Sequence, residues 1–293
     1  MKNNGIELTD YNEIRALLAR HGFRFSKSLG QNFLTAAWVP RRIAEEAGLD
    51  EGTGVVEIGP GVGCLTVELS RRAGRVVSIE LDRALMPVLS ETLTGCENVE
   101  VVFGDAAKLD LRKLVAEELA GLRPVVCANL PYNVTSPLLT ALLEAGCFET
   151  ITVMIQREVA RRLCAGPGSA DYGAFGLFVQ WHCEAELLFD VPPGCFVPQP
   201  KVTSSVVRLT RREKPPVEVR DEKLLFAVIR AAFNQRRKTL VNALASGLGL
   251  DKAQAEAVIV GAGYSPLIRG EAIGLGGFAT ISDEISALRR GDL

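Results

Sequence analysis

VVEIGPGVG, residues 55–63, is an apolar run that ends in three closely spaced glycines. A short β-branched run of this kind is typical of a buried strand in a parallel sheet. Glycines at the end of such a strand let the backbone come close to a ligand at the carboxyl edge of the sheet. The stretch therefore predicts a strand, a ligand-binding loop and an α/β fold.

Strand-like runs alternate with segments of helical length after this stretch. The β-branched runs are residues 55–58, 76–79, 99–102, 125–128 and 151–154. The helical segments between them include residues 81–93, 111–120 and 137–145. Alternation at this spacing predicts parallel strands joined by helical crossovers. Two later runs, 185–191 and 204–209, are bridged by a proline-rich turn and predict an antiparallel edge hairpin.

Pro215-Pro216 separates this pattern from a purely helical one. The helical segments after it are residues 222–233, 236–244, 252–262 and 281–289. We therefore expect an α/β domain over residues 1–212, with an N-terminal helical extension over residues 1–50 in which residues 11–20 form an amphipathic helix. A small helical domain should follow over residues 217–293.

The composition is that of an ordinary globular protein, with 47% hydrophobic and 23% charged residues among 293. No apolar run approaches the roughly 18 residues that a membrane span needs, and the start lacks the apolar stretch of a signal peptide. We expect a cytoplasmic protein with no membrane partner. Seven scattered cysteines without a Cys-x-x-Cys pair, and only two histidines, predict neither a disulfide framework nor a metal site.

The net charge of −2 hides two basic segments. Residues 15–42 contain six bases and no acid, and residues 201–238 contain eleven bases against four acids. Either segment alone is explained by a solvated face. Two of them on a net acidic chain favour a polyanionic partner.

Two acids follow the glycine loop at the ends of the next two predicted strands. Glu80 lies 21 positions after Gly59, where a carboxylate can accept hydrogen bonds from ribose hydroxyls, and Asp105 can hold an adenine amino group. The third glycine of the dinucleotide pattern is replaced by Cys64, so that fingerprint fails. The arrangement resembles the S-adenosylmethionine loop of Rossmann-like methyltransferases.

The fourth strand ends in Asn129-Leu130-Pro131-Tyr132. The Asn129 side-chain oxygen and the Leu130 carbonyl can each accept one N–H of an adenine amino group, which aims its lone pair at a methyl donor. Tyr132 can stack on the flipped base. Such a turn could also be a helix entry in which Pro131 fixes the backbone.

Together these motifs resemble the ribosomal RNA adenine N6,N6-dimethyltransferases of the KsgA/RsmA type over nearly the whole chain. Three further segments carry the likeness: KSLGQNFL (27–34), FVPQPKVTS (196–204) and AFNQRRKTL (232–240). The departures are small, with Thr203 where Asp is common and Gly63-Cys64 in a variable part of the loop. The resemblance implies a class I methyltransferase domain with a mostly parallel seven-stranded sheet and a small helical C-terminal domain.

The resemblance also implies roles for individual residues. The cofactor-binding positions are Asn32, Leu34, Gly59, Gly61, Glu80, Asp105 and Asn129. The catalytic positions are Asn129, Leu130, Pro131, Tyr132 and Phe196, with Phe196 facing Tyr132 across the target base. The RNA-binding candidates are Lys201, Arg236, Arg237 and Lys238. Phe196 could instead fill the core, and the basic residues could be surface charges. Three consecutive bases cannot share one helix face, so we expect only one or two of the last three to contact RNA.

The implied activity is methyl transfer from S-adenosylmethionine to N6 of two adjacent adenosines in a 16S rRNA hairpin loop near its 3′ end, during assembly of the small subunit. We expect a monomer acting on 16S rRNA within that subunit. The nearest alternative is a 23S rRNA adenine methyltransferase of the macrolide-resistance type. A non-catalytic assembly or transcription factor and a nicotinamide oxidoreductase are the others.

Overall fold

The computed structural model describes residues 2–24 and 30–290. Contacts between residues divide the chain into two compact units. The first comprises Met1–Ala160 and Ala185–Arg211, and the second comprises Arg161–Glu184 and Arg212–Leu293. We describe each unit separately.

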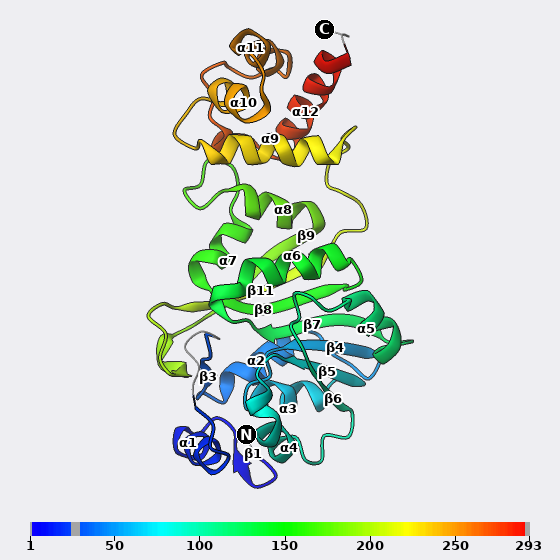
Figure 1. Ribbon diagram of the computed structural model, residues 1–293, viewed down its shortest axis with the longest axis vertical. Coiled ribbons are helices and arrows are strands. Elements are labelled where there is room, and N and C mark those ends of the chain that lie inside the picture. Colours follow the sequence, from blue (N-terminus) through cyan, green and yellow to red (C-terminus); the bar gives the residue numbers. More distant parts are fainter. Residues whose placement is uncertain (1, 25–29, 291–293) are drawn as a thin grey trace. The chain divides into compact units, whose positions relative to one another are not determined.

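The first unit is built on a seven-stranded sheet with the order β6-β5-β4-β7-β8-β11-β9 (Figure 1). Its strands are β4 (Thr53–Ile58), β5 (Arg75–Glu80), β6 (Val99–Phe103), β7 (Arg123–Asn129), β8 (Thr150–Gln156), β9 (Cys183–Val191) and β11 (Ser204–Arg211). The pairs from β6 to β8 are parallel, and β11 pairs with β8 in the antiparallel sense. The mostly parallel seven-stranded sheet is thus confirmed, with β9 at its edge.

Helices connect the parallel strands, as the alternating pattern predicts. The connecting helices are α3 (Cys64–Ser70), α4 (Met86–Thr92), α5 (Leu111–Glu118) and α6 (Thr135–Ala145). Two more helices flank them: α2 (Trp38–Glu46) precedes β4, and α7 (Arg157–Cys164) follows β8 and crosses from one unit to the other. The helix expected over residues 81–93 begins only at Met86, because residues 83–85 form a 3₁₀ turn capped by the Asp82 side chain. The centre of the sheet is covered on both faces, since every residue of β4 is buried.

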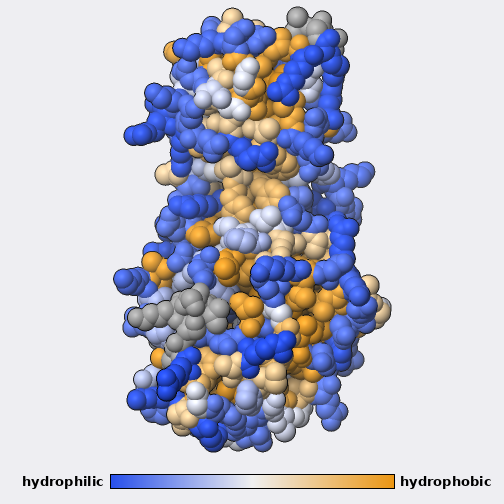
Figure 2. Space-filling view, in the orientation of Figure 1, coloured by the Kyte–Doolittle hydropathy of each residue, from blue (hydrophilic) through white to orange (hydrophobic). Residues whose placement is uncertain are grey.

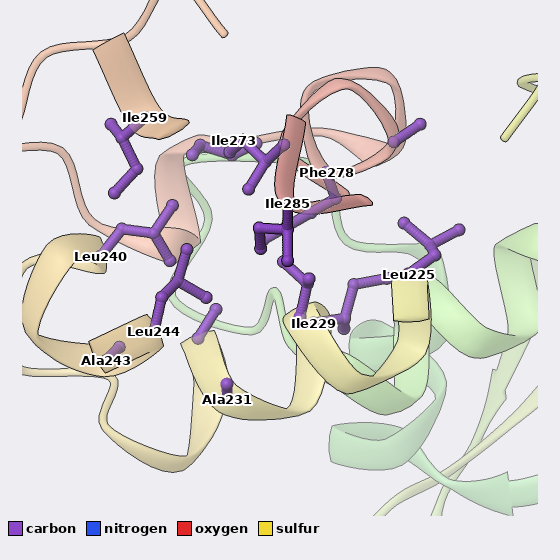
Figure 3. Close-up of a cluster of buried hydrophobic side chains, with 14 of the residues drawn as sticks. Leu225, Ile229, Ala231, Leu240, Ala243, Leu244, Ile259, Ile273, Phe278 and Ile285 are labelled. Carbon is purple, nitrogen blue, oxygen red and sulfur yellow. The ribbon is translucent and has the colours of Figure 1, made fainter. Parts of the chain in front are cut away.

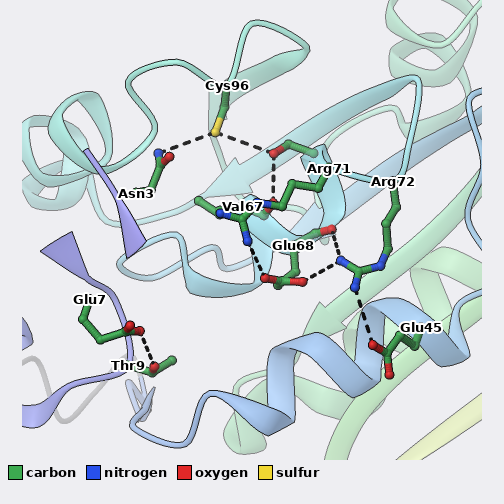
Figure 4. Close-up of polar contacts among 10 residues, drawn as sticks. Asn3, Glu7, Thr9, Glu45, Val67, Glu68, Arg71, Arg72 and Cys96 are labelled. Carbon is green, nitrogen blue, oxygen red and sulfur yellow. Dashed lines mark hydrogen bonds and ion pairs between the residues drawn. The ribbon is translucent and has the colours of Figure 1, made fainter. Parts of the chain in front are cut away.

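A buried carboxylate fixes α3, the helix that follows the glycine loop (Figure 4). Glu68 is 2% exposed and accepts hydrogen bonds from Arg71 at 2.8 Å and from Arg72 at 2.5 Å. Arg72 also lies 3.6 Å from Glu45 of α2. A buried charge is stable only when it is paired, so this network holds α3 in one place against its neighbour.

The N-terminal segment contains short strands as well as helices. Its elements are β1 (Lys2–Asn3), β2 (Ile6–Glu7), α1 (Tyr11–Arg20) and β3 (Phe33–Leu34). The α1 helix has the predicted bounds and is capped by Asp10, whose side chain accepts from two backbone amides. The strand β3 pairs with β10 (Phe196–Val197), which lies far along the chain. An all-helical extension over residues 1–50 was therefore only partly right.

The second unit is helical. Its helices are α8 (Ala174–His182), α9 (Glu222–Asn234), α10 (Leu240–Leu248), α11 (Lys252–Gly261) and α12 (Leu275–Arg290). Leu225 and Ile229 of α9, Leu244 of α10, and Phe278 and Ile285 of α12 point into one apolar core (Figure 3). The helix expected from Arg236 begins at Leu240, because the chain forms a turn directly after α9.

The division into units differs from the predicted boundary near residue 212. Residues 161–184 belong to the helical unit although they precede two strands of the sheet. Tyr172, Leu177 and Trp181 are buried in the same apolar core as the C-terminal helices, and the Tyr172 hydroxyl donates to the Ile273 carbonyl at 2.9 Å. Pro215-Pro216 therefore lies near only one of the points where the chain passes between the units.

In the part of the chain that the structure describes, no helix combines the length and the hydropathy needed to cross a membrane. Figure 2 shows one face of the molecule, on which hydrophilic residues predominate and apolar residues lie between them.

Candidate active site

A cavity of about 370 Å³ lies in the first unit, at the carboxyl ends of its parallel strands. It is lined by the predicted cofactor residues Asn32, Leu34, Gly59, Gly61, Glu80, Asp105 and Asn129, and by the rest of the tetrapeptide, Leu130–Tyr132. We call this set the strand-end site. The fold brings these residues together from five separate parts of the sequence, because parallel strands expose their carboxyl ends at one edge.

The glycine loop requires its glycines for two different reasons. Gly59, Gly61 and Gly63 all have positive φ angles, which side chains other than glycine rarely adopt. At Gly61 a Cβ atom would also lie 3.0 Å from the ring of Phe33. A side chain at Gly61 would therefore be strained and crowded at once.

Glu80 is fixed at the end of β5 with its carboxylate at the cavity. Its residue is 6% exposed, and its Oε1 atom accepts from the Asp82 backbone amide at 2.8 Å. Burial raises the pKa of Glu80. Burial of a carboxylate is unfavourable unless hydrogen-bond donors surround it, and the paired hydroxyl groups of a ribose would be such donors.

Asp105 is more open to solvent than Glu80. Its carboxylate accepts from the Ala107 backbone amide at 3.1 Å and lies 3.1 Å from the Lys108 ammonium group. The hydrogen bond from Lys108 lowers the pKa of Asp105. Asp105 is therefore ionised near neutral pH and can accept a hydrogen bond from an adenine amino group.

The tetrapeptide is held mainly through its backbone. The Leu130 amide donates to the Met154 carbonyl at 3.1 Å, and the Thr135 hydroxyl donates to the Pro131 carbonyl at 3.1 Å. The Asn129 amide group donates to the Asn32 carbonyl at 3.4 Å, which orients its side-chain oxygen. The turn is thus held by hydrogen bonds to β8, to α6 and to the N-terminal motif.

Tyr132 is anchored at its far end as well. Its hydroxyl group lies 2.5 Å from the hydroxyl group of Ser204, the first residue of β11. Burial raises the pKa of Tyr132, so the phenol stays protonated near neutral pH.

Glu57 is a residue of this cavity to which the sequence analysis gave no role. It is 1% exposed and accepts hydrogen bonds from Thr66 at 2.7 Å and from Ser78 at 2.6 Å. Burial raises its pKa to about 7. The signal was visible in the sequence, since Glu57 is an acid within an apolar strand and its register partner on β5 is the polar Ser78.

Phe196 does not line the cavity in the described part of the structure. It is 4% exposed and packs in the core cluster that contains Leu34 and Cys195. This geometry agrees with the alternative in which Phe196 fills the core, and its stacking on a base remains a prediction. Lys201 is exposed in the segment that leads to β11.

The three consecutive bases of the helical unit do not lie on a helix. Arg236–Lys238, which we call the basic turn, follows the last residue of α9, and the Lys238 amide donates to the Gln235 carbonyl at 2.8 Å. The prediction that these three residues lie on one helix, from which we expected only one or two of them to contact RNA, was therefore wrong. Arg236 is bound within its own unit, to the Glu271 carboxylate at 3.0 Å and the Ala170 carbonyl at 2.7 Å. Arg237 and Lys238 are exposed.

Part of the N-terminal motif cannot be placed. Lys27, Ser28 and Leu29 lie outside the described residues, whereas Gly30–Leu34 borders the cavity. Gln31 donates to the Asp82 carboxylate at 2.9 Å, and the Asn32 side chain donates to the Gly30 carbonyl at 3.0 Å. These bonds fix the described end of the motif at the cavity.

Comparison with known proteins agrees with this geometry. Residues 22–261 match the family model described as ribosomal RNA adenine dimethylase. A ribosomal RNA small subunit methyltransferase A from Geobacillus thermodenitrificans is 46% identical over 281 residues, which is 94% of this chain and 96% of the relative. The protein of the same name from Shouchella clausii is 47% identical over 282 residues, or 94% of this chain and 95% of the relative.

Solved structures share the fold. The 23S rRNA methyltransferase ErmE is 28% identical with a TM-score of 0.65, over 87% of this chain and 99% of its own. A dimethyladenosine transferase from Plasmodium falciparum is similar in fold, with a TM-score of 0.70 at 23% identity over 88% of this chain and 98% of its own. From the extent of the family match and the identity to its curated relatives, this chain belongs to the ribosomal RNA adenine dimethylase family.

Proposed function

We propose that this enzyme transfers methyl groups from S-adenosylmethionine to N6 of two adjacent adenosines in a 16S rRNA hairpin loop near the 3′ end, during assembly of the small subunit. The observation that carries the proposal is the single cavity in which the glycine loop, two strand-end carboxylates and the Asn129–Tyr132 turn meet. The relatives named small subunit methyltransferase A support the choice of rRNA.

The residues of the cavity fit the proposed methyl donor. Gly59 and Gly61 line the cavity and carry no side chains, so backbone amides of the loop can approach the donor closely. The buried Glu80 carboxylate suits the ribose hydroxyls, and Asp105 suits the adenine amino group. When bound, S-adenosylmethionine supplies a methyl group on a positively charged sulfur atom.

The tetrapeptide then performs the positioning. The amino nitrogen of adenine is a weak nucleophile because its lone pair is delocalised into the ring. The Asn129 side-chain oxygen and the Leu130 carbonyl each accept one of its N–H bonds, which draws the nitrogen towards a tetrahedral arrangement. In this orientation the lone pair would face the methyl group that S-adenosylmethionine supplies when bound, and the methylated nitrogen would lose its extra proton to water. Positioning of this kind carries most of the rate.

Tyr132 supplies a stacking surface for the flipped base. Its ring borders the cavity beside Asn129, so a base that reaches the amide would lie against the ring. Phe196 would have to leave its present packing to stack on the other face of the base. We therefore assign the stacking role first to Tyr132, which already lines the cavity.

A 23S rRNA activity is the second candidate, because ErmE shares 28% identity and the fold. The higher identity to small subunit enzymes, 46% and 47%, favours the first.

The deciding experiment incubates the enzyme with labelled S-adenosylmethionine and with unmethylated small or large subunits. Nucleoside analysis should find N6,N6-dimethyladenosine in the 16S rRNA alone, and primer extension should stop at two adjacent positions. Label in 23S rRNA alone would establish the second candidate. Binding of the donor without transfer to either subunit would favour a non-catalytic assembly factor.

We further propose that the enzyme acts as a cytoplasmic monomer that contacts 16S rRNA within the small subunit. The basic segments at residues 15–42 and 201–238 support an RNA partner. Light scattering coupled to size-exclusion chromatography should give a mass near 31.6 kDa.

A further inference from the structure

Ser204 is a buried hydroxyl at the edge of the strand-end site. It begins β11, is 0% exposed and lies opposite Gln156 of β8 in the sheet register. A buried hydroxyl needs a hydrogen-bond partner, because leaving it unpaired is unfavourable. Its partner is the Tyr132 hydroxyl, 2.5 Å away.

The position of Ser204 is itself fixed by its neighbours. The Arg157 amide donates to the Thr203 carbonyl at 3.0 Å, and β11 pairs with β8 from Ser204 onward. Since the β11–β8 ladder continues from Ser204, the serine cannot follow Tyr132 if the ring moves. Ser204 therefore holds the Tyr132 hydroxyl group in one position through this hydrogen bond.

Tyr132 is therefore held at two ends. The Thr135 hydroxyl binds the Pro131 carbonyl and lies 3.4 Å from the Tyr132 carbonyl, which holds the backbone. The Ser204 hydroxyl holds the far end of the side chain. A ring fixed at both ends has its long axis set before any base arrives, and this reduces the entropy lost when a base stacks.

We infer that Ser204 is a positioning residue for methyl transfer, acting by fixing the long axis of the Tyr132 ring, against whose face the target base stacks. The inference rests on the proposed function, since it assumes that Tyr132 contacts the base. Ser204 touches neither the base nor the methyl donor, so its effect should pass entirely through Tyr132.

This mechanism predicts that two different variants have the same effect. Ser204→Ala and Tyr132→Phe each remove the same hydrogen bond while keeping the aromatic ring. Each should lower kcat about threefold to tenfold, the scale of one hydrogen bond. The KM for small subunits and the affinity for S-adenosylmethionine should stay within about twofold of wild type, because other contacts determine them.

The double variant provides the decisive comparison. If both variants act through one bond, the double variant should be no slower than the slower single variant, rather than slower by the product of the two effects. Ser205→Ala is the matched control, because Ser205 is equally buried and its hydroxyl binds Asp190 instead of Tyr132. It should keep wild-type kcat.

The measurements are initial rates with labelled S-adenosylmethionine and unmethylated small subunits, donor affinity by calorimetry, and melting curves. An unchanged kcat in Ser204→Ala, multiplicative effects in the double variant, or an equal loss in Ser205→Ala would overturn the inference. If Ser204→Ala does not fold, Tyr132→Phe decides alone, since a wild-type kcat there would also overturn it. Failure of wild type to methylate small subunits would instead reject the proposed function and, with it, this inference.

Discussion

The strand-end site and the basic turn differ in how their functional side chains are held. At the strand-end site, Glu80 is bound by a backbone amide and Tyr132 by a buried hydroxyl. In the basic turn, Arg236 is bound within its own unit, whereas Arg237 and Lys238 are exposed. Groups that position reacting atoms are fixed in advance, but groups that only attract a polyanion need no such fixation.

The largest effect is expected when the basic turn is removed together with α9 to α12. A chain that ends at Arg212 would leave Tyr172, Leu177 and Trp181 without their core partners. We expect it to aggregate, so the predicted domain over residues 1–212 should not fold on its own. Circular dichroism and size-exclusion chromatography, with a chain ending at Arg290 as control, would measure this. A monomeric, cooperatively melting product would contradict the expectation.

The next effect separates positioning from binding within the strand-end site. Asn129→Ala should lower methyl transfer about a hundredfold or more, because the adenine nitrogen loses one acceptor that orients it. Affinity for S-adenosylmethionine should change little, since Glu80 and Asp105 are untouched. Glu80→Ala is the counterpart and should weaken donor binding by about 1.5–3 kcal/mol. Calorimetry and single-turnover rates would check both, and near wild-type turnover in Asn129→Ala would remove it from the mechanism.

Alanine variants of Phe196 and Tyr132 should differ in whether they lower stability or methyl transfer. Phe196→Ala should lower the free energy of unfolding by about 3–5 kcal/mol, because it empties a packed position. Tyr132→Ala, at the cavity wall, should cost less stability but reduce transfer about tenfold to a hundredfold, the scale of base stacking. Urea denaturation and methylation rates would test the pair. A Phe196→Ala variant with normal stability and slow transfer would establish stacking instead.

The buried carboxyl group of Glu57 should make the free energy of unfolding depend on pH. Burial raises the pKa of Glu57 to about 7 in the folded protein, from about 4.5 in the unfolded chain. Because the folded pKa is raised, its contribution is full below about pH 4.5 and is lost as pH rises through about 7, by up to about 3 kcal/mol. Glu57→Gln, which stays neutral, should therefore gain stability over wild type between about pH 5 and 8 in the absence of ligand. Parallel stability curves from urea denaturation would contradict this assignment.

The smallest effect concerns the basic turn itself. Replacing Arg237 and Lys238 by Gln should reduce the salt slope of log K for small subunits by about 0.7–0.9 per lost phosphate contact. Arg236→Gln should leave the slope unchanged and lower stability by about 1 kcal/mol, a modest value because the ion pair is partly exposed. Filter binding across a salt series and thermal melts would separate the two. A slope change in Arg236→Gln alone would reverse the assignment.

The sequence predicted most of the sheet because periodicity and glycine placement are local signals. Strands β4 to β8 and the bounds of α1 follow directly from them. The site residues that follow a strand end were also predicted, since parallel strands bring their ends together. Family likeness added the N-terminal motif and residues 196–204.

What the sequence could not predict depends on contacts between distant segments. Ser204 reaches Tyr132 across 72 positions, and Arg236 reaches Ala170 across 66. Nothing local distinguishes a bound arginine from an exposed one, so Arg236 was grouped with its two neighbours. Phe196 was assigned by family likeness to a face that its packing in this structure does not present.

The interleaving of residues 161–184 with the C-terminal helices has a consequence for synthesis on the ribosome. Tyr172 and Trp181 emerge long before Ile273 and Phe278, with which they share a core. In the meantime β9 and β11 emerge and can complete the sheet. The first unit can therefore fold while the chain is growing, but the core that residues 161–184 share with α9 to α12 is completed only when translation is almost finished. During that interval the nascent chain would expose apolar side chains of the incomplete core, to which a chaperone could bind.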